Sequence, residues 1–153
     1  MKAQVSARIA RPVGDVWTFV AHPANMQRWV SGVDEPPLVD GSEASVGTRF
    51  RMNYRYGGRT HDVLAEVVAS DPPRKQTVRW IEGPFPFEGS VELGGDDGGT
   101  MVTRTVSAGA DSRVTAIMFA VAGPLLRKLM GRQIRQDLDR LQAALESGAR
   151  ANP

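Results

Sequence analysis

The chain has 153 residues, about the length of one domain, and its 41% hydrophobic and 24% charged residues are the balance of a globular protein. It has no cysteine and two histidines, His22 and His61, which excludes disulfides, thiolate metal sites and cysteine nucleophiles, and we expect no metal and no cofactor. The net charge of +2 comes from residues 111–153, which carry +3; nucleic-acid-binding domains have a stronger basic stripe, so we expect no nucleic-acid partner.

The first quarter of the chain predicts a strand followed by two short helical segments. Apolar and polar residues alternate over residues 4–10, which is typical of a half-buried strand. After Pro12, apolar residues recur at helical spacing over residues 13–20 and predict a short helix, and residues 24–28 predict one more turn. Residues 29–39 contain a glycine and two adjacent prolines, which favours an edge strand or an irregular arm.

A β-hairpin is the clearest local prediction. Residues 48–56 and 59–70 both alternate between apolar and polar side chains, and Gly57-Gly58 between them suits a two-residue turn with positive φ. Such a turn pairs residues whose numbers sum to 115, so Tyr54 faces His61. The same register pairs apolar residues on one face, namely Met52 with Val63 and Phe50 with Ala65.

Three further strands follow. Residues 75–81, 87–93 and 100–107 alternate as strands do. The inward-facing residues of the first two are Val78, Trp80, Phe87 and Val91. In the third strand Arg104 must share its face with the valines two positions away on either side, because side chains alternate along a strand.

A long helix is predicted over residues 112–147, where apolar residues recur every three or four positions. They are Met130, Ile134, Leu138, Leu141 and Leu145. Gly123-Pro124 should bend or restart this helix, because proline lacks the N–H donor.

We expect a cytoplasmic protein with one domain over residues 1–147 and a frayed tail over residues 148–153. The N-terminus has no signal-peptide pattern. The longest apolar run, residues 114–126, is shorter than the roughly 20 residues that span a bilayer as a helix.

Four short segments stand out together. They are residues 9–20, His22-Pro23 leading to Trp29, residues 46–50, and Gly98-Gly99-Thr100. This set resembles the START/Bet v 1-like (SRPBCC) superfamily, including its polyketide cyclase/dehydrase-like group. The resemblance implies an α+β helix-grip fold, in which a seven-stranded, highly curved antiparallel sheet wraps around a long C-terminal helix, with two short helices between strands 1 and 2. It also implies an apolar cavity between the sheet and the helix.

The resemblance and the strand alternation together predict a lining for this cavity. The sheet would contribute Phe50, Met52, Val63, Ala65, Val78, Trp80, Phe87 and Val91. The helix would contribute Met118, Leu125, Leu126 and Leu129. Tyr54, His61 and Arg104 share the apolar face and would form a polar end, since a buried arginine needs an anionic or carbonyl partner. The alternatives are that the apolar residues pack as solid core, and that His61 and Arg104 reach water at the strand ends.

The leading functional hypothesis is a small soluble protein, monomer or homodimer, that binds an apolar molecule such as a lipid, polyketide or isoprenoid. Relatives implied by the resemblance also include hormone receptors and aromatase/cyclases, so the fold does not decide the function.

Two other functions rank below it. A polyketide aromatase/cyclase or dehydratase would use His61 with Tyr54 or Arg104. No carboxylate on its face orients His61, so we assign no catalytic residue and do not favour an enzyme. An interaction module or toxin-like regulator would act through the basic helix residues Arg127, Lys128, Arg132 and Arg135.

Overall fold

The computed structural model describes residues 2–39, 45–109 and 113–147, with side chains for all of these except residues 113–116, 118 and 119. The strands are β1 (Lys2–Ile9), β2 (Leu38–Val39), β3 (Arg49–Tyr56), β4 (Arg59–Asp71), β5 (Lys75–Glu82), β6 (Phe87–Asp96) and β7 (Gly99–Ala108). The helices are α1 (Val13–Val20), the 3₁₀ helix η1 (Pro23–Arg28) and α2 (Arg113–Glu146).

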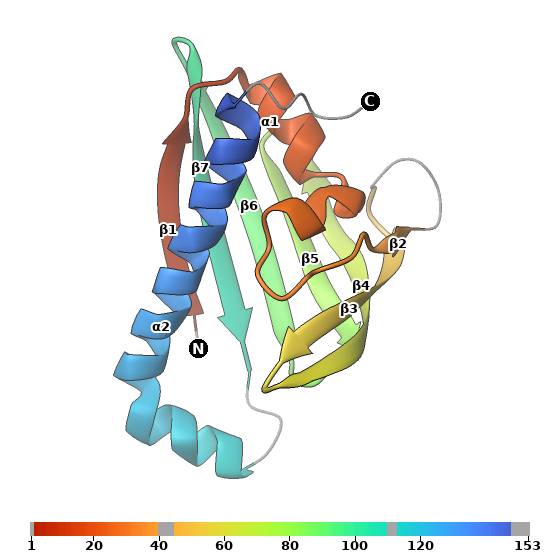
Figure 1. Cartoon of the computed structure of the whole chain (residues 1–153), viewed down its shortest axis with the longest axis vertical. Helices are drawn as coiled ribbons and strands as arrows, with labels where there is room; N and C mark the ends of the chain where they lie inside the picture. The colour runs from red at the N-terminus through yellow and green to blue at the C-terminus, as the bar shows by residue number, and fades with distance from the viewer. Residues whose placement is uncertain (1, 40–44, 110–112, 148–153) are drawn as a thin grey trace.

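All seven strands form one antiparallel sheet in the order β1-β7-β6-β5-β4-β3-β2. The sheet is curved, and its inner face carries the helices (Figure 1). α2 packs along β1, α1 packs on β6 and β7, and η1 contacts both α2 and β2. The arrangement confirms the predicted helix-grip fold, including the two short helices between the first two strands.

The β3–β4 hairpin has the predicted register. Tyr54 pairs with His61, and Met52 pairs with Val63. Gly57 and Gly58 have φ values of +62° and +76°, the left-handed backbone that a two-residue turn of this kind requires. The turn therefore fixes which residues of both strands share the inner face.

The core fills one end of the space between the sheet and the helices. Phe19 of α1, Phe50 of β3 and Leu138 of α2 are fully buried there. The apolar face of α2 is buried from Ile134 onward, as its spacing predicts. Toward its N-terminus α2 bends and stands away from the sheet (Figure 1), and Pro124, which lacks the N–H donor, lies inside the helix.

Residues 29–39 form a mostly irregular arm that ends in a short edge strand, in agreement with the two predicted alternatives. Leu38–Val39 forms the short β2, and Val33 makes an isolated bridge to Tyr54. Trp29, Val30 and Val33 are buried, so this segment folds over the inner face because it buries apolar surface there. The predicted tail over residues 148–153 lies outside the described residues. Among those that are described, no helix is long and apolar enough to cross a membrane.

Candidate ligand-binding pocket

A cavity of about 510 Å³ lies on the inner side of the sheet, between β3, β5, β6 and β7 and the middle of α2. Its volume falls in the range of roughly 300–1,000 Å³ that is usual for small-molecule pockets. The sheet supplies Met52, Tyr54, Tyr56, Trp80, Phe87, Arg104, Val106 and Ala108, and the β5–β6 loop supplies Pro84 and Phe85. The opposite side is formed by Met26, Val30, Ser31, Val33, Leu126, Leu129, Met130, Gln133, Ile134 and Asp137.

Aromatic rings form one wall of the cavity. The Trp80 ring stacks on Phe87 with centroids 4.4 Å apart, and it contacts the rings of Phe85 at 5.0 Å and Tyr54 at 4.9 Å. Tyr56 continues the cluster against Phe85 at 4.9 Å. Rings held by several neighbours present a fixed apolar surface, so this wall is preformed.

Arg104 is the cationic side chain among the described residues that line the cavity. It lies in β7 between Val5 of β1 and Val91 of β6, and alternation with the neighbouring valines turns it inward, as predicted. Its exposed fraction is 8%. A Cβ on Gly89 would lie 2.9 to 3.1 Å from the guanidinium atoms, so the glycine on β6 leaves the space that the guanidinium occupies.

No side chain or backbone group of the described part of the chain makes a hydrogen bond or ion pair with the Arg104 guanidinium, which lies 5.3 Å from the centre of the Trp29 ring. Burial lowers the pKa of Arg104 to about 10, and the charges of Asp137 and Tyr54 partly oppose that shift. The guanidinium therefore stays charged at neutral pH in a place where water does not solvate it well.

Asp137 of α2 brings a carboxylate to the same cavity. Its Oδ1 accepts hydrogen bonds from the backbone N–H of Ser31 at 3.1 Å, from the Ser31 hydroxyl, and from Arg140 at 2.8 Å. Arg140 also donates to the Ser31 hydroxyl at 2.6 Å. This network ties the 29–39 segment to α2 and holds the carboxylate against the pocket.

The Tyr54 hydroxyl is kept neutral at this site. Burial raises the pKa of Tyr54, and the nearby Asp137 and Tyr56 raise it further, while Arg104 acts in the opposite direction. A neutral phenol can donate a hydrogen bond. Arg104 and Tyr54 thus give the cavity one cationic and one neutral donor.

The structure brings seven of the predicted lining residues to the cavity: Met52, Tyr54, Trp80, Phe87, Arg104, Leu126 and Leu129. Phe50, Val63, Ala65 and Val91 lie in the core instead, and Val78 packs against it partly buried. They share the inner face with the lining residues, but helices pack onto that part of the sheet and fill the space. Leu125 is exposed on α2, and the side chain of Met118 lies outside the described residues.

His61 does not line the cavity. It is half-buried near the β3–β4 turn, where its Nε2 lies 3.2 Å from the Tyr56 carbonyl oxygen and donates to it. A general base must come within hydrogen-bond distance of the proton that it removes, and a side chain outside the cavity does not reach a ligand held there. The geometry therefore gives the cyclase hypothesis no support from His61.

Several residues opposite the sheet were not among the predicted lining residues, including Asp137, Met26, Val30 and Ser31. Asp137 lies three residues after Ile134 and four before Leu141, inside the buried face of α2, and a carboxylate at such a position is a detectable signal. Met26, Val30 and Ser31 belong to a segment with no regular periodicity, so no comparable signal marks them. Within the described ranges, no group of three or more His, Asp or Glu residues could hold a metal ion.

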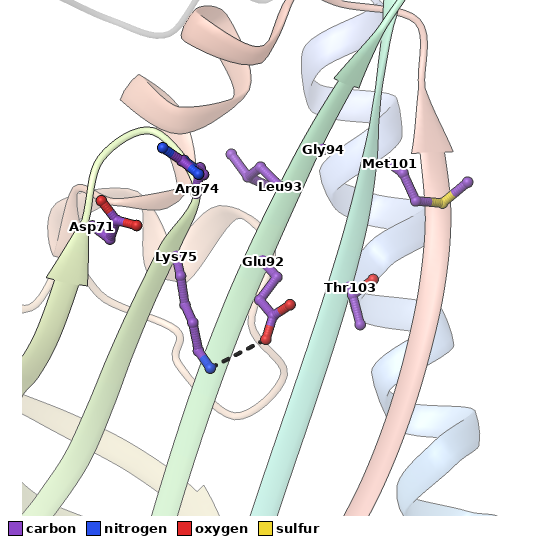
Figure 2. A pocket seen from close by; sticks show the side chains of 8 residues that line it. All are labelled: Asp71, Arg74, Lys75, Glu92, Leu93, Gly94, Met101 and Thr103. Atoms are coloured by element: carbon purple, nitrogen blue, oxygen red, sulfur yellow. Dashed lines mark ion pairs between the residues drawn. The ribbon is translucent and has the colours of Figure 1, made fainter.

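A second hollow lies on the outer face of the sheet (Figure 2). It is lined by Asp71, Arg74, Lys75, Glu92, Leu93, Gly94, Met101 and Thr103. Lys75 and Glu92 form an ion pair across it at 3.2 Å, with both side chains about half exposed. Exposed charges that pair with each other need no ligand, so the inner cavity is the candidate site.

Residues 1–146 match the protein family described as "Polyketide cyclase / dehydrase and lipid transport". The chain belongs to this family. No curated protein sequence matches it. Membership of the polyketide cyclase / dehydrase and lipid transport family, with this fold, makes the chain a small-molecule-binding domain.

Solved structures share the family's fold at low identity. TTHA0849 from Thermus thermophilus has a TM-score of 0.76 and 20% identity, over 97% of this chain and 99% of that chain. A START superfamily protein from Mycobacterium smegmatis has a TM-score of 0.74 and 11% identity, over 95% and 97%. The di-domain ARO/CYC StfQ from the steffimycin biosynthetic pathway has a TM-score of 0.73 and 16% identity, over 97% of this chain and 52% of that chain.

Proposed function

We propose that this protein binds an amphipathic small molecule of the lipid, polyketide or isoprenoid type, whose apolar part fills the cavity and whose anionic or carbonyl group contacts Arg104. Arg104 carries the proposal, because a buried guanidinium in an apolar wall has no acceptor among the described residues. Such a charge costs folding free energy unless something pairs with it. A ligand oxygen supplies that partner.

The rest of the cavity supports the same ligand class. The rings of Trp80, Phe85 and Phe87 give an apolar wall for a hydrocarbon or planar body. The Tyr54 hydroxyl can donate a second hydrogen bond to the oxygen that Arg104 holds. Since many apolar bodies fit such a wall, the head group provides the selectivity.

Native mass spectrometry of the purified chain, followed by solvent extraction, looks for a natural ligand. One apolar species per chain supports the proposal and identifies its class. A titration with Nile red, a neutral apolar dye, then measures whether the cavity accepts a ligand when the purified chain carries none.

Two neighbouring substitutions make the Nile red titration specific for the cavity. Leu126→Trp places an indole in the cavity and should weaken dye binding by about tenfold or more. Leu125→Trp is the matched control, because Leu125 is exposed and does not line the cavity. Equal affinity in both variants, or no dye binding by the folded chain, would contradict binding in this cavity.

Head-group recognition is tested separately by displacing Nile red with oleate and with oleyl alcohol. A charge-assisted contact to Arg104 should make oleate about 10 to 100 times the stronger competitor. Arg104→Met should remove that preference and leave the affinity for oleyl alcohol unchanged. Equal competition by the two ligands with the unaltered chain would show that Arg104 does not read the head group.

A further inference from the structure

Part of α2 presents large apolar side chains to solvent. Ile117, Val121, Leu125 and Leu129 are 63%, 80%, 60% and 49% exposed. They recur every four residues, so they follow one side of the helix. We name these four residues the apolar stripe. It lies where α2 stands away from the sheet (Figure 1), and the exposed fractions show that the described part of the chain leaves it uncovered.

The apolar stripe reaches the mouth of the cavity. Leu129 belongs to both, because it lines the cavity and is half exposed. Tyr56, at the tip of the β3–β4 hairpin, also lines the cavity and is exposed. The hairpin tip and the N-terminal part of α2 lie at the same end of the molecule (Figure 1). Whatever contacts the stripe therefore lies beside the cavity opening.

Basic residues continue the line of the stripe along α2. Lys128, Arg132 and Arg135 follow Leu125 at steps of three, four and three residues, and all three are exposed. We name them the basic shoulder. Residues 113–136 contain no acidic residue, and the described part of the chain gives Lys128 and Arg132 no ion pair. Arg135 donates to the backbone carbonyl of Ser6 at 3.3 Å.

We propose that this end of α2 docks on an anionic lipid bilayer, with the apolar stripe in the headgroup boundary and the basic shoulder against the lipid phosphates. Apolar side chains beside unpaired cations are the composition of helices that lie in a membrane interface. A second copy of the chain fits less well, because a two-fold interface would bring like charges together. Nucleic acid fits less well too, because it offers nothing to the exposed apolar residues. Docking goes beyond ligand binding in the cavity and does not depend on it.

Vesicle flotation with the full chain tests this surface. We expect the chain to bind vesicles of phosphatidylcholine mixed with phosphatidylglycerol and to bind phosphatidylcholine alone much more weakly. Val121→Asp with Leu125→Asp, and separately Lys128→Glu with Arg132→Glu, should each weaken binding to the anionic vesicles about tenfold or more. Added salt should weaken binding of the unaltered chain.

Matched control variants distinguish the effect of this surface from the effects of a change in net charge or in the number of exposed apolar residues. Arg74→Glu with Lys75→Glu makes the same change of net charge on the outer face of the sheet (Figure 2). Leu38→Asp removes an exposed apolar residue of β2. Both control variants should bind the anionic vesicles like the unaltered chain. Circular dichroism and urea unfolding show that each variant is folded.

Three results would overturn the proposal. The folded, unaltered chain could fail to bind anionic vesicles. The control charge reversal could weaken binding as much as reversal of the basic shoulder. Sedimentation could find a dimer that Val121→Asp with Leu125→Asp dissociates, which would assign the stripe to self-association. Nile red binding, measured without vesicles and compared between Leu126→Trp and Leu125→Trp, reports on the cavity, so failure of docking and failure of ligand binding are distinguishable.

Discussion

The buried charge of Arg104 lowers the free energy of unfolding of the unliganded protein. Burial disfavours the charged form and lowers the pKa of Arg104 in the folded chain to about 10, well below its ordinary range. The unfolded chain therefore holds this proton more tightly than the folded chain. This destabilisation is fully present below pH 10, and it decreases only as the pH rises above the pKa of Arg104 in the folded chain. At neutral pH the residue thus lowers the stability of the unliganded protein.

Replacing that charge with a side chain of similar length should stabilise the unliganded protein. We expect Arg104→Met to raise the free energy of unfolding at neutral pH by about 1–3 kcal/mol, measured by urea unfolding. Arg79→Met is the control, since Arg79 is exposed and pairs with Glu88 on the outer face, and it should change stability little. An Arg104→Met variant that unfolds more easily would mean that Arg104 stabilises the fold without a ligand.

A substitution at Gly89, which lies beside the Arg104 guanidinium, perturbs the contact between Arg104 and the ligand less than Arg104→Met does. A Cβ at position 89 would lie 2.9 Å from Nη2 of Arg104, whereas a Cβ at position 94 would meet nothing within 4 Å. Gly89→Ala should therefore move the guanidinium and reduce the preference for oleate over oleyl alcohol several-fold, about 1 kcal/mol or less. Gly94→Ala, in the same strand, should leave the preference unchanged. Identical preferences in both variants would show that the guanidinium position does not decide recognition.

At the scale of elements, the two ends of α2 differ in what they contribute to stability. Leu141→Ala removes a fully buried side chain from the core and should cost about 2–5 kcal/mol of unfolding free energy. Leu125→Ala removes an exposed side chain of the same type and should change it by about 0.5 kcal/mol or less. Urea unfolding of both variants measures the difference. A large loss in Leu125→Ala would mean that the apolar stripe is covered in solution.

Elements were predictable where local chemistry decides them. Two glycines set the β3–β4 turn, and the turn set the register that paired Tyr54 with His61. The position of the cavity depends instead on which helices pack against the inner face. The alternation of residues along a strand gives no information about that packing. Phe50 and Met52 lie on the same face of β3 and are both buried in the core, yet only Met52 also lines the cavity. Asp137 was missed because the buried face of α2 was predicted from its apolar residues only.

At the scale of the whole molecule, the helix-grip fold separates stability from binding. The buried part of α2, with α1, closes the core at one end of the sheet. The cavity lies between the sheet and the middle of α2, near where this helix bends away from the sheet (Figure 1). The overall fold was predicted from the family resemblance, and the order of the elements agrees with it because a curved antiparallel sheet with one apolar face can bury that face under a helix. The space that remains unfilled depends on helix position, which is set by tertiary packing and not by periodicity.

Ligand binding should therefore stabilise the protein by pairing with the buried charge of Arg104, which destabilises the unliganded fold. A ligand that binds only the folded state, at 100 times its Kd, adds about 2.7 kcal/mol, which for a chain of this length raises the Tm by about 5–10 °C. We expect oleate to give such a shift with the unaltered chain and a clearly smaller one with Arg104→Met, measured by differential scanning calorimetry. The variant should start from the higher Tm and gain less, since the charge that destabilises the unliganded state is the one the carboxylate neutralises. An equal rise in Tm in both proteins would show that Arg104 does not contribute to oleate binding and that the carboxylate lies elsewhere in the cavity.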